Sequence, residues 1–546
     1  MNLVPSVTQQ QATEARMRQL QQEQAQLEQQ LRVQQFAAQY QTQFSFPALV
    51  ESTKAGIAPR TDSELIQHRL LEAGLLFEVP TSVGETVEAV AGFVQQLEAS
   101  GCFNAVQVKL GGSTSSEDEK SDPSRKLTVT LDEKNWYKLY LGGGLKRDAF
   151  QQTSTPFGAS STHDTSFLPT AELEASVGLR NVAGYLDTTD LQYTLDTHQM
   201  STWSLQHQRP LYSALPSGFA LRDWILLLPS GSQYSLLSKA VWDTVDWELT
   251  RSFRECQRLL SVTACTTRQT LPPFGASIEW SLLFRDIIPR RHSSLPYHFD
   301  ASPEVLAHSG PSVKHSVSLR VEGNQFSDPE ASPYFPTSGY QYRIQTEAAV
   351  PPGDAGFLKS QADVALHVPV PSFLGSLNDL LPISFHAMGS LGVLKTISFD
   401  GLCRTSASFS DRFLMGGPSN FKGFSPAGIG PRAAKTSSSK SSTGDAIGGD
   451  FFYKITAMMS AAVPAPGTRM FAFGTVGTCA EIFSQQRWQT VSPRDVLASS
   501  RASVGVGLST TMLGPRLDVT YAWPLRYGPV DHRRNFQIGM GFSMFD

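Results

Sequence analysis

The sequence lacks any long hydrophobic segment. Its longest strongly apolar run, from Trp224 to Leu228, is far shorter than the roughly 20 residues that a membrane-spanning helix requires. A helical membrane protein is therefore excluded. A membrane protein built from strands is not excluded, because each strand needs only about 9–11 residues to cross a bilayer.

Charged residues are also scarce. They make up 17% of the chain, against roughly 25% in soluble domains. The formal net charge of -4 gives no bulk attraction to nucleic acid, so no nucleic-acid partner is predicted. Hydrophobic residues reach an ordinary 40%. This balance suits a strand-built barrel, in which small and uncharged polar residues fill the lumen-facing positions.

Motifs for catalysis and metal binding are missing. The five cysteines are scattered without a CxxC pair, and the eleven histidines form no HExxH motif. No GxxxxGK[ST] phosphate loop occurs. The sequence therefore predicts a protein that is not an enzyme, with no metal, no cofactor and no small-molecule substrate.

The N-terminus carries no recognisable targeting segment. It has no basic stretch followed by a roughly 7–15-residue apolar one, which argues against a secretory signal. Glu14, Glu23 and Glu28 argue against an acid-poor transit peptide. For a membrane barrel, this pattern favours an organelle outer membrane over a bacterial one, because bacterial barrels need export.

Three segments differ in pattern. Residues 1–43 are rich in glutamine, and a thin heptad seam predicts a helical tail that is either frayed or in coiled-coil contact with a partner. Residues 44–135 predict a strand at 44–50, helices at 62–74 and 82–101, and strands at 105–110 and 126–131. Capping residues open both helices, and glycines end them. This β-α-α-β-β order resembles a POTRA (polypeptide-transport-associated) domain.

From residue 136 to 546 the pattern becomes one of alternation. In one example, Ile278, Trp280, Leu282 and Phe284 alternate with Ser277, Glu279 and Ser281. A soluble β-sandwich also alternates, but so many such segments without helices between them favour one large closed sheet. At roughly 25 residues for a strand and its connection, about 16 strands fit.

The last segment of the chain alternates most clearly. Phe536, Ile538, Met540, Phe542 and Met544 share one face of a strand, and Gln537, Gly539, Gly541 and Ser543 share the other. An apolar outer face and a polar inner face are typical of a membrane barrel. Gln537, Gly539, Phe542 and Met544 also fit a pattern similar to the sorting signal on the final strand of mitochondrial barrel proteins.

Residues 412–449 carry the most specific motif. Its marked positions are Gly416, Gly417, Pro418, Phe421, Lys422, Gly423 and Phe424. This segment resembles the inward-folded sixth loop of the BamA-like barrel-assembly superfamily. Its residue pattern is most similar to that loop in the mitochondrial branch of the superfamily. Segments 178–184, 501–507 and 514–525 resemble other strand regions of that family in the same order. The resemblance covers residues 44–546.

The resemblance implies an all-β transmembrane barrel of about 16 antiparallel strands (136–546), preceded by one POTRA domain (44–135) facing the intermembrane space. It further implies the central barrel subunit of the mitochondrial sorting and assembly machinery (SAM complex). Such a subunit folds and inserts β-barrel precursors into the mitochondrial outer membrane. The implied partners are those precursors, membrane lipid and accessory subunits of the complex.

The family mechanism implies a lateral gate between the first and last strands. In this sequence the gate residues are Tyr137, Leu139, Leu141, Gly142, Gly143 and Gly144 on one side, and Phe536, Ile538, Gly539, Gly541 and Phe542 on the other. Glycine weakens strand pairing, so this seam is a place where the sheet can open. Alternatively, these glycines relieve crowding or mark a bulge.

One position departs from the family pattern. Lys422 stands where the family usually has arginine, and Thr475 stands at the wall position that the arginine normally reaches. Lysine cannot reproduce the planar fork of arginine. The loop anchor is therefore altered, or Asp518 on the lumen side is the partner. Residues 433–445 look like a flexible serine-rich insertion within the loop.

The sequence also allows three other functions. A passive porin-like pore shares the final-strand pattern and the alternation, but not the POTRA-like segment or the loop motif. A plastid-type protein-import channel typically carries more POTRA domains and a transit peptide. A soluble all-β binding protein with a coiled-coil tail also alternates, and extraction by alkaline carbonate would favour it.

Overall fold

The computed structural model describes residues 41–42, 44–53, 58–73, 75, 81–111, 125–146, 170–196, 200–211, 232–268, 274–291, 299–326, 335–369, 383–404, 406–433, 444–463, 465, 467–483, 493–511 and 516–541. The predicted helical tail lies outside these ranges, apart from its last residues. The chain divides into two compact units. The described part of the first unit comprises residues up to Tyr137 together with Leu179–Thr188, and the remaining described residues form the second.

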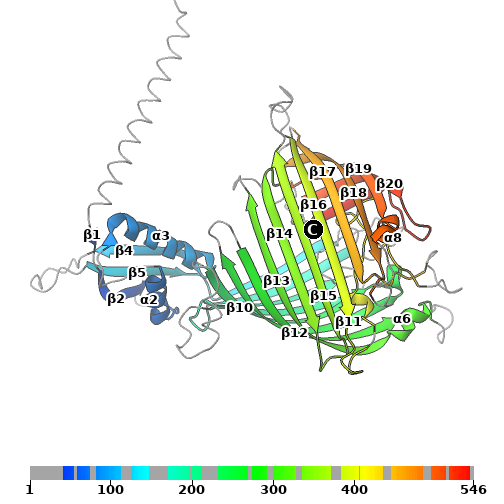
Figure 1. Cartoon of the computed structure of the whole chain (residues 1–546). Coiled ribbons are helices and arrows are strands. Elements are labelled where there is room, and N and C mark those ends of the chain that lie inside the picture. Colours follow the sequence, from blue (N-terminus) through cyan, green and yellow to red (C-terminus); the bar gives the residue numbers. More distant parts are fainter. Residues whose placement is uncertain are drawn as a thin grey trace, which may run out of the picture. The chain divides into compact units, whose positions relative to one another are not determined.

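The first unit has the element order that the sequence predicts (Figure 1). Its elements are β2 (Phe44–Ser52), α2 (Ser63–Glu72), α3 (Val83–Ala99), β4 (Phe103–Gly111) and β5 (Arg125–Glu133). The sheet order is β2-β5-β4, with β2 parallel and β4 antiparallel to β5. Two short strands, β1 (Gln41–Thr42) and β3 (Thr81–Ser82), pair with each other. The predicted helix and strand positions are therefore confirmed to within a few residues.

Apolar side chains from both helices pack on this three-stranded sheet. Ile66 and Leu70 of α2, Phe93 of α3 and Leu131 of β5 are fully buried in one core. The side chain of Asp62 accepts a hydrogen bond from the backbone N–H of Glu64 at 3.0 Å, so it caps α2 as predicted. Burial of this apolar face stabilises helices that would be marginal on their own.

A turn far downstream in the sequence completes the first unit. Leu186, in the turn after β7 (Thr170–Arg180), is buried in the same core. Asn181 donates from Nδ2 to the hydroxyl of Thr61 at 2.8 Å, and the N–H of Asp62 donates to the carbonyl of Gly184 at 3.1 Å. Gly184 has a positive φ, and a Cβ there would lie 2.7 Å from a backbone oxygen, so only glycine fits.

A buried carboxylate holds the same region of the first unit together. Glu133, at the end of β5, accepts hydrogen bonds from the N–H and hydroxyl of Thr61 and from the N–H and guanidinium of Arg60, at 2.6–3.1 Å. Burial alone would raise the pKa of Glu133, but these hydrogen bonds to its charged form outweigh burial and lower the pKa.

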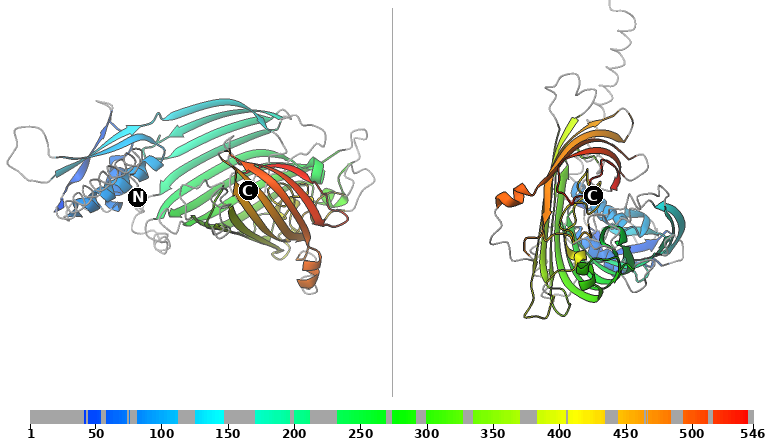
Figure 2. Two further views of the ribbon diagram at one scale, coloured as in Figure 1. Left: turned by 90° about the horizontal axis from the view of Figure 1, so that it is seen from above. Right: turned by 90° about the vertical axis from the view of Figure 1, so that its right-hand side faces the viewer.

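The second unit is built on one 16-stranded sheet (Figure 2), the predicted strand number. Its strands are β6 (Tyr137–Lys146), β7, β8 (Thr188–Asp196), β9 (Ser201–Leu211), β10 (Ser232–Asp246), β11 (Phe253–Arg268), β12 (Phe274–Pro289), β13 (Gly310–Phe326), β14 (Gly339–Ala349), β15 (Phe357–Pro369), β16 (Ile383–Thr396), β17 (Phe451–Ala462), β18 (Thr468–Ala480), β19 (Arg501–Thr510), β20 (Arg516–Arg526) and β21 (Phe536–Gly541). They pair in chain order, so β6 and β21 are the two end strands.

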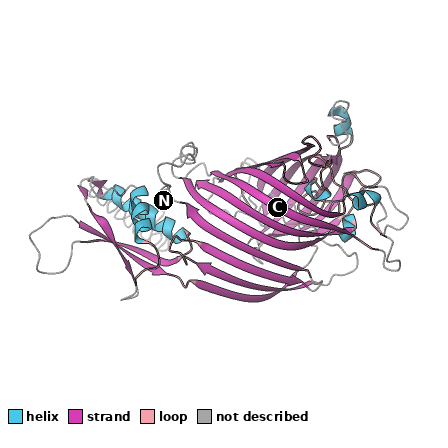
Figure 3. Cartoon of the chain, turned by 90° about the horizontal axis from the view of Figure 1, so that it is seen from below, coloured by secondary structure: helices cyan, strands magenta, loops and turns pink. Residues whose placement is uncertain are grey.

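Exposure alternates along these strands as predicted. On β12, Ile278, Trp280 and Phe284 are exposed apolar residues, whereas the neighbouring Leu283 and Arg285 are buried. Strands therefore present one apolar face outward and one mixed face inward. Short helices occur only in connections of the described second unit (Figure 3): α5 (Glu248–Arg251), α6 (Pro303–Ala307), the 3₁₀ turn η3 (Phe409–Asp411) and α8 (Pro493–Ala498). No described helix is long and apolar enough to cross a bilayer.

Candidate functional site

Most of the connection between β16 and β17 is buried, and we call residues 406–450 of it, described at 406–433 and 444–450, the inner loop. Phe413, Met415, Phe421, Phe424 and Ile429 form a core with residues of the strands around them. Backbone bridges fold the loop on itself, including Met415 to Ile429 and Gly417 to Phe421. The predicted serine-rich insertion lies mostly outside the described residues.

Glycines of the predicted motif make this compact path possible. Gly416, Gly417 and Gly423 all have positive φ, between 95° and 123°, which side-chain-bearing residues rarely adopt. Gly416 also lies so close to the carbonyl of Ser425 that a Cβ would collide with it. The motif therefore specifies a backbone conformation, as its glycine content suggests.

A buried carboxylate anchors the inner loop to the inner wall of the sheet. Asp411 accepts from the guanidinium of Arg285 on β12 at 2.6 Å and from the ammonium of Lys314 on β13 at 3.0 Å. Lys359 on β15 donates to the backbone carbonyl of Asp411 at 2.8 Å. Next to it, the hydroxyl of Ser410 donates to Glu255 on β11. We call this group the Asp411 anchor.

The charges of the Asp411 anchor are balanced within it. Burial alone would raise the pKa of Asp411, but the charges of Arg285 and Lys314 hold it well below its usual range. Glu347 adds a further carboxylate, 2.9 Å from Lys314. A buried charge of this kind is tolerated only when it is paired and hydrogen-bonded. The stability of the anchor therefore depends on each of its charged side chains.

The far end of the inner loop is tied to the turn that contains α5. Arg251, fully buried, donates to the carbonyls of Phe409 at 2.7 Å and Ala446 at 2.9 Å. Asp445 accepts from the hydroxyl of Ser252 at 2.6 Å and from the N–H of Ser302 at 2.8 Å. Both ends of the loop are thus held against the same region of the wall.

A second anchor joins the middle of the inner loop to the last strand. Gln537 on β21 is 3% exposed and uses both ends of its amide. The N–H of Gly423 donates to its Oε1 at 2.8 Å, and its Nε2 donates to the carbonyl of Phe424 at 2.7 Å. Gly539 of the same strand faces Pro418, where a Cβ would lie 2.9 Å from the proline ring. We call this contact the Gln537 anchor.

Backbone hydrogen bonds extend the Gln537 anchor into the segment before β21. The N–H of Arg534 donates to the carbonyl of Gly423 at 3.0 Å, and the N–H of Ser425 donates to the carbonyl of His532 at 2.9 Å. The inner loop therefore pairs with residues that lead directly into the last strand.

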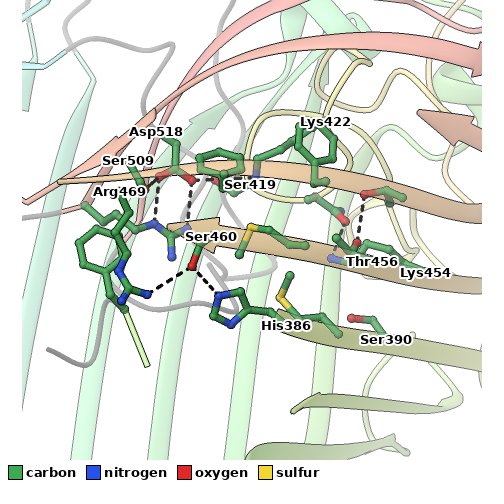
Figure 4. A pocket seen from close by; sticks show the side chains of 18 residues that line it. His386, Ser390, Ser419, Lys422, Lys454, Thr456, Ser460, Arg469, Ser509 and Asp518 are labelled. Carbon is green, nitrogen blue, oxygen red and sulfur yellow. Dashed lines mark hydrogen bonds and ion pairs between the residues drawn. The ribbon is translucent and has the colours of Figure 1, made fainter. Parts of the chain in front are cut away.

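Lys422 lies at the wall, and one of its two predicted partners is near it (Figure 4). Its ammonium is 3.9 Å from the carboxylate of Asp518, whereas Arg516 approaches the same carboxylate at 3.1 Å. Thr475 instead shares a hydrogen bond with Thr456 at 3.1 Å. Burial lowers the pKa of Lys422, and the charge of Asp518 opposes this. The long Lys422–Asp518 separation agrees with the view that lysine anchors this loop less firmly than a bidentate arginine would.

Charge reversal at Lys422 is expected to loosen the inner loop. In Lys422→Glu a carboxylate would face Asp518 in a largely buried site, so hydrogen exchange of loop amides 419–424 should rise about tenfold or more. The same reversal at the exposed Lys395 should leave this exchange unchanged. Unaltered loop exchange, together with a normal rate of client-barrel assembly, would show that Lys422 does not lock the loop.

The described residues predicted for the gate lie on the two end strands of the sheet, whereas Phe542 lies outside the described residues. Leu139, Leu141 and Phe536 are exposed on its outer face. A Cβ at Gly142 would collide with the ring of Tyr140. The alternative that these glycines relieve crowding fits Gly539, whereas the exposed ring of Tyr140 can move away from a Cβ at Gly142. Phe542 and Met544 of the sorting-signal pattern lie outside the described residues.

Sequence reasoning missed Asp411 and the loop contact of Gln537. Asp411 directly precedes the motif, and a carboxylate beside so apolar a segment was its one signal. Gln537 was assigned only to the sorting-signal pattern. Within the described residues, no group of three His, Cys, Asp or Glu side chains is placed to hold a metal ion.

Comparison with known proteins agrees with this architecture. Residues 308–544 match the Omp85 superfamily domain. A SAM50-like protein of Schizosaccharomyces pombe (strain 972) is 23% identical over 481 residues, covering 85% of this chain and 83% of that protein. The solved structure of BamA from Haemophilus ducreyi lacking POTRA domains 1–3 is similar with a TM-score of 0.60 and 15% identity, covering 90% of this chain and 84% of that one. This likeness confirms the predicted fold, a 16-stranded barrel preceded by a small α+β module.

Proposed function

We propose that this chain is an assembly protein of the Omp85 superfamily, whose domain matches residues 308–544, and that it folds and inserts β-barrel precursors into the mitochondrial outer membrane. The matches to the Omp85 superfamily domain and to the SAM50-like protein support the prediction that the chain is not an enzyme. The precursor would enter through a lateral gate between β6 and β21.

The observation that carries the proposal is the Gln537 anchor. It links β21, one end strand of the sheet, to an inner loop whose other contacts reach the opposite wall. An end strand has backbone donors and acceptors on its free side, and these can template an incoming strand by β-augmentation. A loop that holds one end strand from within is suited to controlling when that edge becomes available.

Two further features support the proposed location. The SAM50-like relative and the sorting-signal pattern at Gln537 and Gly539 support the mitochondrial outer membrane. On this proposal, the N-terminal unit is a POTRA domain that faces the intermembrane space. Precursor barrels, membrane lipid and accessory subunits of an assembly complex are the partners.

Depletion of the protein tests this function directly. Cells would be depleted of the chain, and import of newly made radiolabelled porin into isolated mitochondria would be followed on native gels. We expect porin to cross the outer membrane but to fail to reach its mature, carbonate-resistant form.

The same experiment distinguishes assembly from passive transport. Re-expression of the wild-type chain should restore porin maturation. Normal maturation in depleted mitochondria, alongside impaired metabolite flux, would instead identify a passive pore and would rule out the insertase function.

A further inference from the structure

A cavity of about 70 Å³ lies on the inner wall between β16–β20 and the inner loop (Figure 4). It has room for several water molecules, and so for a small ligand group. Among the described residues, four cationic side chains and one carboxylate, that of Asp518, line it. The cations are Lys422, Lys454, Arg469 and Arg516.

The single carboxylate is already engaged. Arg516 donates to Asp518 at 3.1 Å and 3.2 Å, and the hydroxyl of Ser509 also donates to it. In the described part of the chain, no carboxylate lies within ion-pair distance of Arg469 or Lys454. Lys454 contacts only the side-chain oxygen of Asn420, at 3.3 Å. The cavity wall therefore carries excess positive charge.

Arg469 is the most constrained of these cations. It is 9% exposed and donates one side-chain hydrogen bond, from Nη1 to the hydroxyl of Ser460 at 3.2 Å. The same hydroxyl is 2.8 Å from Nε2 of His386. The ring of Phe335 lies 5.8 Å from the guanidinium. These contacts fix the direction of the guanidinium, and no described carboxylate compensates its charge.

We propose that this cavity binds a small oxyanion, a carboxylate or a phosphate, against the guanidinium of Arg469. A buried charge without a partner is costly, and an anion in the cavity would remove that cost. Guanidinium groups bind planar and tetrahedral oxyanions through two parallel N–H donors. This site goes beyond the assembly function and does not depend on it.

Titration of the purified full-length chain with inorganic phosphate tests the proposal. Binding would be followed calorimetrically in detergent at constant ionic strength, with chloride replaced by phosphate. We expect saturable binding that Arg469→Gln weakens at least tenfold. Lys239→Gln, which removes a charge from β10 outside the cavity, should bind as the wild type does.

A parallel titration with N-acetylglutamate identifies the source of the oxyanion. Tighter binding of phosphate would indicate a dissolved phosphate-bearing ligand, and binding of the carboxylate at least as tight would indicate an acidic side chain within the lumen. Both results support the site, provided that Arg469→Gln weakens them.

Two results would overturn the proposal: equal affinity in the wild type and Arg469→Gln, or a non-saturating response to both anions. If Arg469→Gln does not fold, Arg469→Lys takes its place. It keeps the charge but loses the paired donors, so its affinity should fall several-fold, and wild-type affinity in this variant would also count against the site.

Discussion

Replacing Asp411 with asparagine is expected to release the inner loop from the wall formed by β11–β15 and to slow the maturation of client barrels at least tenfold. The substitution keeps the shape of the side chain but removes the charge at the centre of the Asp411 anchor. Arg285 and Lys314, both almost completely buried, would then lose their shared partner.

The size of the effect follows from the burial of these cations. Removing one member of a buried ion pair typically costs about 3–5 kcal/mol, because the remaining charge is left uncompensated. Glu347 stays 2.9 Å from Lys314, but Glu255 is 3.9 Å from Arg285. The guanidinium of Arg285 therefore loses its nearest negative charge. Without this ion pair, the turn at Phe409–Asp411 should detach from β12.

Two measurements check this expectation. Hydrogen exchange of the inner loop should increase in the purified variant, and porin maturation should slow in mitochondria that carry it. Asp400→Asn is the matched control, because Asp400 lies in the exposed turn after β16 and has a conformation that asparagine tolerates. If Asp411→Asn matches this control in both measurements, the anchor does not hold the loop.

The sequence predicted the elements of this fold better than the contacts between them. Alternation along Ile278 to Phe284 identified β12, because the period of a strand is local. Capping at Asp62 placed the start of α2 for the same reason. The inner loop was predicted from the resemblance of residues 412–449 to a family motif, and glycines of that motif have the positive φ values that only glycine adopts readily.

The two anchors could not be predicted from local sequence patterns, because each joins residues that lie far apart in the sequence. Asp411 and Arg285 are 126 positions apart, and no periodicity relates them. Gln537 and Gly423 are 114 positions apart, and the lumen-facing side of β21 gave no indication of what it faces. Asp518 was the exception, since its place on the lumen face of β20 made it a candidate partner for Lys422.

Gln537→Leu is expected to free the last strand from the inner loop. Leucine has a similar size but offers neither donor nor acceptor, so the N–H of Gly423 and the carbonyl of Phe424 would both lose a buried partner. Leaving one such group unsatisfied costs about 1–3 kcal/mol. Hydrogen exchange of the β21 amides should therefore rise at least tenfold, since about 1.4 kcal/mol corresponds to a factor of ten.

The measurement must separate this contact from the sorting-signal pattern, to which Gln537 also belongs. Purified protein refolded in detergent avoids any need for the signal. Gln257→Leu is the matched control, because Gln257 is a buried, lumen-facing glutamine on β11 whose amide nitrogen has no partner among the described residues. It should leave exchange in β21 unchanged.

The two outcomes lead to different views of the gate. Faster exchange of the β21 amides in Gln537→Leu but not in Gln257→Leu would mean that the inner loop holds one edge of the sheet closed, so that this edge opens only after the contact between the loop and Gln537 breaks. Because the Asp411 anchor holds the same loop to the opposite wall, Asp411→Asn should then also raise exchange in β21. If the β21 amides exchange as slowly in Gln537→Leu as in Gln257→Leu, pairing with β20 alone holds β21 in place. The proposal that the inner loop controls this edge of the sheet would then be wrong.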